Sequence, residues 1–113
     1  MHELSLAENV LQIIEDAARE QGFEQVRTVW LEVGQLACVE QEALRFAFDV
    51  VTRDSIAQQA RLEIIETAGQ GRCEKCGQSF LLATIYEACP ACGSYQVSVT
   101  DGDAMRVREL EVE

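Results

Sequence analysis

Residues 73–77 read Cys-Glu-Lys-Cys-Gly and residues 89–93 read Cys-Pro-Ala-Cys-Gly, with twelve residues between Cys76 and Cys89. Two residues separate the thiols of each pair, so both sulfurs of a pair can face one point from a tight turn. A glycine follows each pair, and glycine can adopt the positive φ that turns backbone N–H groups toward the sulfurs. Two such turns placed face to face offer four thiolates in a tetrahedron, the geometry of a closed structural Zn²⁺ site.

The four thiols of Cys73, Cys76, Cys89 and Cys92 are therefore predicted to hold one structural zinc ion. Four protein sulfurs leave no open coordination position, which argues against a catalytic zinc. The segment between the pairs has too few large apolar side chains for a core of its own. Zinc binding, worth about 10–16 kcal/mol in small peptides, would substitute for that core. A single iron or a dithiol redox pair in the same cluster are the alternatives at this point.

Length and composition describe one small globular domain with a metal-stabilised module. The chain has 113 residues and a net charge of −11, from 20 acidic and 9 basic side chains. Such a charge repels phosphate backbones, so we expect no nucleic-acid partner. The sequence shows no secretory leader and no apolar run of about 18 residues, so we expect no membrane association. Cysteines in metal-binding spacing favour a reducing, cytoplasmic location, and the fifth cysteine, Cys38, is expected to be a small buried hydrophobe.

Hydrophobic periodicity predicts two helices and three strands outside the cysteine module. The predicted helices span residues 4–21 and about 40–53, and the predicted strands span residues 25–33, 60–67 and 104–112. The order strand, helix, strand favours a right-handed parallel pairing of the first two strands. The last strand is expected to return to the same sheet, with a bulge near Arg108 or Glu109 where its alternation slips.

The predicted fold class is α+β, with a small three-stranded mixed sheet, two helices and an inserted zinc-ribbon module. Gly69 and Gly71 are interpreted as a hinge into this module, which should contain short strands over residues 79–86 and 95–100. The predicted domains are residues 1–68 with 101–113 for the α/β part, and residues 69–100 for the zinc-binding part.

The N-terminus carries His2, the only histidine of the chain. The amine of Met1 and the amide nitrogen of His2 can close a five-membered ring on a metal ion. The same amide and the imidazole can close a six-membered ring, and the amide or carboxylate of Glu3 can complete a plane. Square-planar, nitrogen-rich sites suit Ni(II) or Cu(II). A histidine that stands at position two by chance is the alternative on spacing alone.

Three stretches together resemble one known family: Met-His-Glu-Leu-Ser at 1–5, Trp-Leu-Glu-Val-Gly at 30–34, and the two cysteine pairs. They are similar to the HypA/HybF nickel metallochaperones of hydrogenase maturation, over essentially the whole chain. This resemblance implies a nickel-binding domain, a separate structural zinc domain, and Ni(II) as transferable cargo for the precursor of the [NiFe]-hydrogenase large subunit. It also implies a HypB-type GTPase as partner. Carried over by position, Met1, His2 and Glu3 are the nickel site, and the four cysteines are the zinc site.

Three positions bear on how far the resemblance to this family extends. Some relatives that also serve urease have histidines beside their zinc cysteines, where this chain has Gly77 and Gly93, and this difference leaves a urease role open. Relatives also have an acid near the start of the second helix that approaches nickel. Glu40 fits that place, although stabilising the positive helix N-terminus is the favoured interpretation.

Other classes of protein predict different observations. A single-iron electron carrier would be coloured, and a zinc-ribbon interaction module would be indifferent to nickel. The sequence offers no pair of nucleophile and base and no phosphate-binding loop, so we do not expect an enzyme. A homodimer, formed by exchange of the inserted module between protomers, is left open.

Overall fold

The computed structural model describes residues 2–113, so the predicted ligand Met1 lies outside the described residues. The elements in chain order are α1 (His2–Gln21), β1 (Val26–Gly34), the 3-10 turn η1 (Gln35–Ala37), α2 (Gln41–Val51), β2 (Arg61–Thr67), β3 (Gly69–Cys73), β4 (Ser79–Leu82), β5 (Val97–Asp101) and β6 (Met105–Val112). No helix of residues 2–113 is long and apolar enough to cross a membrane.

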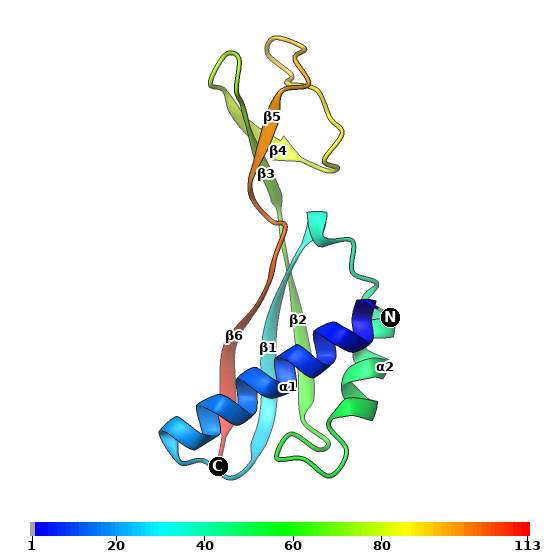
Figure 1. Cartoon of the computed structure of the whole chain (residues 1–113), viewed down its shortest axis with the longest axis vertical. Coiled ribbons are helices and arrows are strands. Elements are labelled where there is room, and N and C mark those ends of the chain that lie inside the picture. The colour runs from blue at the N-terminus through cyan, green and yellow to red at the C-terminus, as the bar shows by residue number, and fades with distance from the viewer. Residues whose placement is uncertain (1) are drawn as a thin grey trace. The chain divides into compact units, whose positions relative to one another are not determined.

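The first sheet has the strand order β2-β1-β6. The N–H of Glu113 donates to the carbonyl of Gln25 at 2.8 Å, and the N–H of Gly34 donates to the carbonyl of Ala104 at 2.9 Å. These bonds make β6 antiparallel to β1, while β1 and β2 run in the same direction with α2 between them in the chain (Figure 1). The predicted small mixed three-stranded sheet with two helices is confirmed.

Two helices and the central strand supply the core of this part of the chain. The fully buried side chains of α1, β1 and α2 include Ala7, Val10, Ile14, Val29, Leu31 and Leu44. They follow the spacing of three and four residues in the helices and of two in the strand, which puts them on one face of each element. The helix α2 begins after Glu40, whose carboxylate accepts hydrogen bonds from the amides of Glu42 and Ala43.

The second sheet has the order β4-β3-β5, with both outer strands antiparallel to β3. Gly69 and Gly71, interpreted from sequence as a hinge, lie inside β3, so that interpretation is wrong. Gly71 pairs with Phe80 on one side and Val99 on the other. A Cβ atom at Gly71 would lie 2.5 Å from a methyl group of Leu82, so the absence of a side chain here permits close packing.

The chain divides into two compact units. Unit 1 comprises residues 1–31, 39–65 and 107–113, and unit 2 comprises residues 32–38 and 66–106. Unit 2 therefore contains all four paired cysteines, together with η1. The assignment of one unit to nickel and of the other to zinc stays a prediction.

Candidate metal centres

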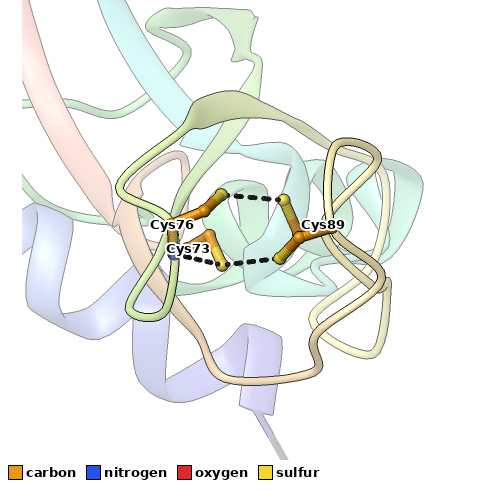
Figure 2. Close-up of side chains that lie close together, drawn as sticks. Cys73, Cys76 and Cys89 are labelled. Atoms are coloured by element: carbon orange, nitrogen blue, oxygen red, sulfur yellow. Dashed lines mark hydrogen bonds between the residues drawn. The ribbon is translucent and has the colours of Figure 1, made fainter.

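The four paired cysteines converge on one point in unit 2. Figure 2 labels three of them, Cys73, Cys76 and Cys89. Their sulfur atoms all lie within 4.8 Å of one another. Two of the sulfur–sulfur distances between the pairs are 3.6 Å for Cys73 to Cys92 and 3.7 Å for Cys76 to Cys89. A tetrahedral ion with metal–sulfur bonds of about 2.3 Å needs sulfur–sulfur edges of about 3.8 Å. The cluster therefore has the dimensions of a four-cysteine zinc site.

Each Cys-x-x-Cys-Gly turn is closed in the same way by backbone hydrogen bonds. In the first turn the N–H of Gly77 donates to the carbonyl of Cys73 at 2.9 Å, and in the second the N–H of Gly93 donates to that of Cys89 at 2.8 Å. Gly77 has φ of 79° and Gly93 has φ of 78°, a left-handed conformation that costs a side-chain-bearing residue energy. The positive φ predicted for both glycines is confirmed. This shared geometry leaves the first thiol of each pair buried and the second exposed.

Backbone donors make one of the thiols acidic. The N–H of Cys76 donates to the Cys73 sulfur at 3.4 Å. This hydrogen bond, opposed by desolvation and supported by the Lys75 amide, lowers the pKa of the Cys73 thiol to about 6. The hydrogen bond from the Gln78 amide lowers the pKa of the Cys76 thiol. Desolvation and the contacts with neighbouring thiols outweigh this hydrogen bond and raise that pKa to about 11. Cys73 is therefore mostly a thiolate at neutral pH, the pKa of the Cys89 thiol is also lowered, and metal binding would release the proton that Cys76 retains.

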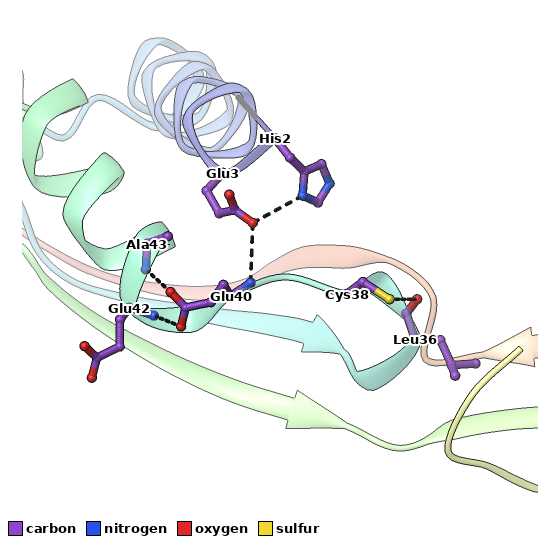
Figure 3. A network of polar contacts seen from close by, with 7 residues as sticks. All are labelled: His2, Glu3, Leu36, Cys38, Glu40, Glu42 and Ala43. Carbon is purple, nitrogen blue, oxygen red and sulfur yellow. Dashed lines mark hydrogen bonds and ion pairs between the residues drawn. The ribbon is translucent and has the colours of Figure 1, made fainter.

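The N-terminal residues form a second polar arrangement, in unit 1 (Figure 3). Nδ1 of His2 lies 3.5 Å from Oε2 of Glu3. The same carboxylate oxygen accepts a hydrogen bond of 3.4 Å from the backbone N–H of Glu40, and this bond is the main reason why the pKa of Glu3 is lowered. Glu40 is itself fixed because its carboxylate caps α2 at 3.0 and 2.9 Å. The start of α2 thus positions the acid that stands beside the imidazole.

His2 and Glu3 lie in the first turn of α1, which begins two residues earlier than the sequence predicts. The first four N–H groups of an α-helix have no partner within the helix. The amide nitrogens of these two residues can therefore serve a metal ion without the loss of a helical hydrogen bond. The His2 side chain is 56% exposed, so a metal ion can reach the imidazole.

The Glu40 carboxylate accepts hydrogen bonds from two backbone amides at the start of α2. This geometry agrees with the interpretation of Glu40 as a residue that stabilises the helix N-terminus.

The prediction that Cys38 is buried is wrong, because its side chain is exposed. Cys38 follows η1 with φ of 56°, a left-handed conformation, and its thiol lies 3.7 Å from the carbonyl of Leu36. Leu36, which is 8% exposed, is the residue of this turn that is buried.

These observations define a small α+β metal-binding protein with a closed four-cysteine module and a polar N-terminal cluster on a helix. Comparisons with known proteins narrow the class. A family profile described as "Hydrogenase/urease nickel incorporation, metallochaperone, hypA" matches residues 1–112. The chain therefore belongs to the HypA family of nickel metallochaperones, which take part in hydrogenase maturation.

Individual relatives match this chain over its full length. The chain is 58% identical to the hydrogenase maturation factor HypA of Albidiferax ferrireducens and 51% identical to that of Azotobacter vinelandii, with 100% of both chains covered in each case. The solution structure of the Ni metallochaperone HypA from Helicobacter pylori matches with a TM-score of 0.77 at 24% identity. That match covers 97% of this chain and 96% of the other, and it shows the fold alone.

Proposed function

We propose that this chain binds one Ni(II) ion through Met1, His2 and Glu3 and delivers it to the precursor of the [NiFe]-hydrogenase large subunit. A HypB-type GTPase would act with it in this delivery. The four cysteines would hold one structural zinc ion, so the two metals would have different roles in one chain. Nickel is the cargo of a carrier, and no catalytic step is assigned to the protein.

The geometry of the first helical turn supports this assignment. The amide nitrogen of His2 belongs to two chelate rings, one closed by the Met1 amine and one by the imidazole. Because that amide lies in the first turn of α1, its proton can be displaced by a metal ion while the helix remains intact. In the present structure Nδ1 faces Glu3 at 3.5 Å, so nickel binding at Nδ1 would replace this contact.

The cysteine cluster supports the structural role proposed for zinc. Four sulfurs at tetrahedral distances leave no position for a substrate or a further ligand. Two of the sulfurs belong to buried residues, Cys73 and Cys89, which limits exchange of a bound ion. Cargo that must be passed on is better held by an accessible site, and the His2 side chain, which is 56% exposed, would provide that access.

A calorimetric titration of the zinc-loaded chain with Ni(II) tests the nickel assignment. We expect one nickel per chain, and we expect His2→Ala to weaken binding by about 100-fold or more because it removes the only imidazole. The matched control is Glu8→Ala, which removes an exposed acid from the same helix and should leave the affinity unchanged. Equal affinity in wild type and His2→Ala would exclude the proposed site.

Extension of the chain before Met1 provides a second test of the ligand set. An added residue converts the Met1 amine into an amide, so nickel affinity should fall although every side chain is retained. If the extended protein binds nickel as tightly as the untagged one, the amine is not a ligand. Transfer of nickel from the loaded chain to a purified large-subunit precursor, with and without the GTPase, would test delivery itself.

A further inference from the structure

An apolar groove of about 260 Å³ lies between the first turn of α1 and one side of α2, within unit 1. Its lining residues are Glu3, Leu4, Ala43, Phe46, Ala47 and Val50. The four residues from α2 recur at steps of three and four, so they form one stripe along that helix. Glu3 is the one charged residue of the six, so the walls of the groove are almost wholly apolar.

The α2 side of this groove exposes two large apolar side chains. Phe46 is 72% exposed and Val50 is 37% exposed. Leu44 and Phe48 of the same helix are buried, so α2 packs in unit 1 without the help of Phe46. Exposed apolar side chains beside a groove mark a contact surface, and aromatic side chains often supply much of the binding energy at protein interfaces.

The groove ends at the proposed nickel site. Glu3 lines the groove, and its Oε2 lies 3.5 Å from Nδ1 of His2. Figure 3 shows Glu3 directed from α1 toward Glu40 at the start of α2, where the Glu40 N–H donates to Oε2 at 3.4 Å. A protein seated in the groove would therefore contact a neighbour of the imidazole. Because nickel passes from one set of ligands to another, the acceptor has to approach this place closely.

Acidic side chains stand on both sides of the groove. Glu42 and Asp49 are exposed and lie four residues before and three residues after Phe46, which makes them its neighbours on the surface of α2. Glu8 is also exposed and follows Leu4 by one turn of α1. These acids form a negatively charged rim around an apolar floor.

The basic side chains of this region do not neutralise the rim. Arg45 donates to the carbonyl of Leu62 in β2. Arg53 lies 3.9 Å from Asp49, and both side chains are mostly exposed, so their ion pair is weak. The surface is therefore complementary to a segment that carries an apolar side chain with basic residues beside it.

We propose that this groove is the docking site of the protein that receives nickel, through a segment that inserts a large apolar side chain flanked by lysine or arginine. The proposal rests on the proposed function, because it takes the acceptor to be the large-subunit precursor. The apolar side chain packs against Phe46, and the basic residues pair with Glu42 and Asp49. Docking in this way holds the acceptor beside Glu3 and His2 while nickel exchanges its ligands.

Binding of the purified large-subunit precursor to the zinc- and nickel-loaded chain tests the proposal. Phe46→Glu should raise the dissociation constant about tenfold or more, and Ala43→Trp, which fills the groove, should act in the same direction. Glu42→Lys should weaken binding at low salt and have less effect at high salt, because salt screens the rim charges. Nickel affinity of Phe46→Glu and Glu42→Lys should remain that of wild type, since neither change removes a proposed ligand.

Two variants serve as matched controls. Tyr86→Glu makes the same kind of change at an aromatic residue of unit 2 that is 80% exposed. Glu20→Lys reverses the charge of an exposed acid near the other end of α1. Both variants should bind the precursor as wild type does, and circular dichroism should show that every variant is folded.

Three results would overturn the proposal. The first is a precursor that binds Phe46→Glu and Ala43→Trp as tightly as wild type, or that does not bind wild type. The second is a loss of binding to the GTPase while binding to the precursor is retained, which would assign the groove to that partner. The third is a change in the oligomeric state of Phe46→Glu alone, which would show that a second copy of the chain covers the groove.

Failure of the proposed function gives a different pattern of results. A chain that docks on the precursor through the groove but passes no nickel to it would contradict delivery and leave the docking site intact. Groove variants that pass nickel to the precursor at the wild-type rate and bind it with wild-type affinity would contradict the docking site and leave delivery intact.

Discussion

The two units of this chain differ in what can hold them together. Among residues 2–113, eleven of the sixteen buried apolar side chains lie in unit 1 and only five lie in unit 2. Two of those five are Cys73 and Cys89, which are metal-ligand candidates rather than ordinary core residues. Unit 1 therefore has a conventional hydrophobic core, whereas unit 2 is expected to depend on a metal ion bound by its cysteines.

The units also differ in charge. Unit 1 carries fourteen acidic and six basic side chains, and unit 2 carries six acidic and three basic ones. The proposed nickel residues thus belong to the more negative unit, whose field attracts a divalent cation. On the proposed assignment, a zinc ion would replace the missing core of unit 2, and unit 1, which has a core of its own, would hold the nickel ion that is passed on.

Removal of zinc should produce the largest effect and should separate the units. A strong chelator is expected to unfold the β3–β5 sheet, because zinc contributes on the order of 10 kcal/mol to such small modules. The strands and helices of unit 1 should persist. Amide hydrogen exchange followed by NMR would show loss of protection in residues 69–101 and retention in α1 and β1. Unfolding of both units together, or of neither, would contradict the comparison.

Removal of a core side chain from unit 1 should have the converse effect. Leu31 is fully buried, so Leu31→Ala is expected to lower the free energy of unfolding by about 3 kcal/mol, within the usual range of 2–5. Chemical denaturation of the zinc-loaded protein measures this change. Phe46→Ala is the control, because Phe46 is 72% exposed and its truncation should cost little. Zinc stoichiometry should stay the same in both variants, and zinc loss in Leu31→Ala would show that the units are not independent.

The smallest predicted effect concerns the start of α2. Glu40→Ala removes two capping hydrogen bonds and should cost about 1 kcal/mol of stability. Glu42→Ala serves as the control, because the Glu42 side chain forms no capping bond among the described residues. The backbone N–H of Glu40 that holds Glu3 is retained in the variant, so nickel affinity should change less than stability. A large loss of nickel affinity would instead favour Glu40 as a ligand.

Much of the fold could be predicted from the sequence, because the spacing of apolar residues along the chain indicates which side chains are buried. The stripe Ala7, Val10 and Ile14 and the alternating residues Val29 and Leu31 are all fully buried. The cysteine spacing likewise predicted a convergent cluster, because short turns closed by glycine leave little conformational choice. Local patterns of this kind depend on neighbours in sequence, and so they can be read without the structure.

The features that were missed depend on contacts distant in sequence. β3 was interpreted as a hinge because glycines are usually turn residues, but pairing with β4 and β5 on both sides makes it the central strand. Cys38 was expected to be buried because of its residue type, but it is exposed, in a left-handed conformation after η1. The bond from the Glu40 amide to Glu3 joins residues 37 positions apart, and no local signal in the sequence predicts it.

Native mass spectrometry of the untagged chain, with and without added Ni(II), tests the central claim of two metals in two roles most directly. The predicted result is one zinc per chain in every preparation and one further nickel after addition, with a mild chelator removing nickel and leaving zinc. Nickel that displaces zinc, or a zinc-loaded chain that takes up no nickel, would contradict the account.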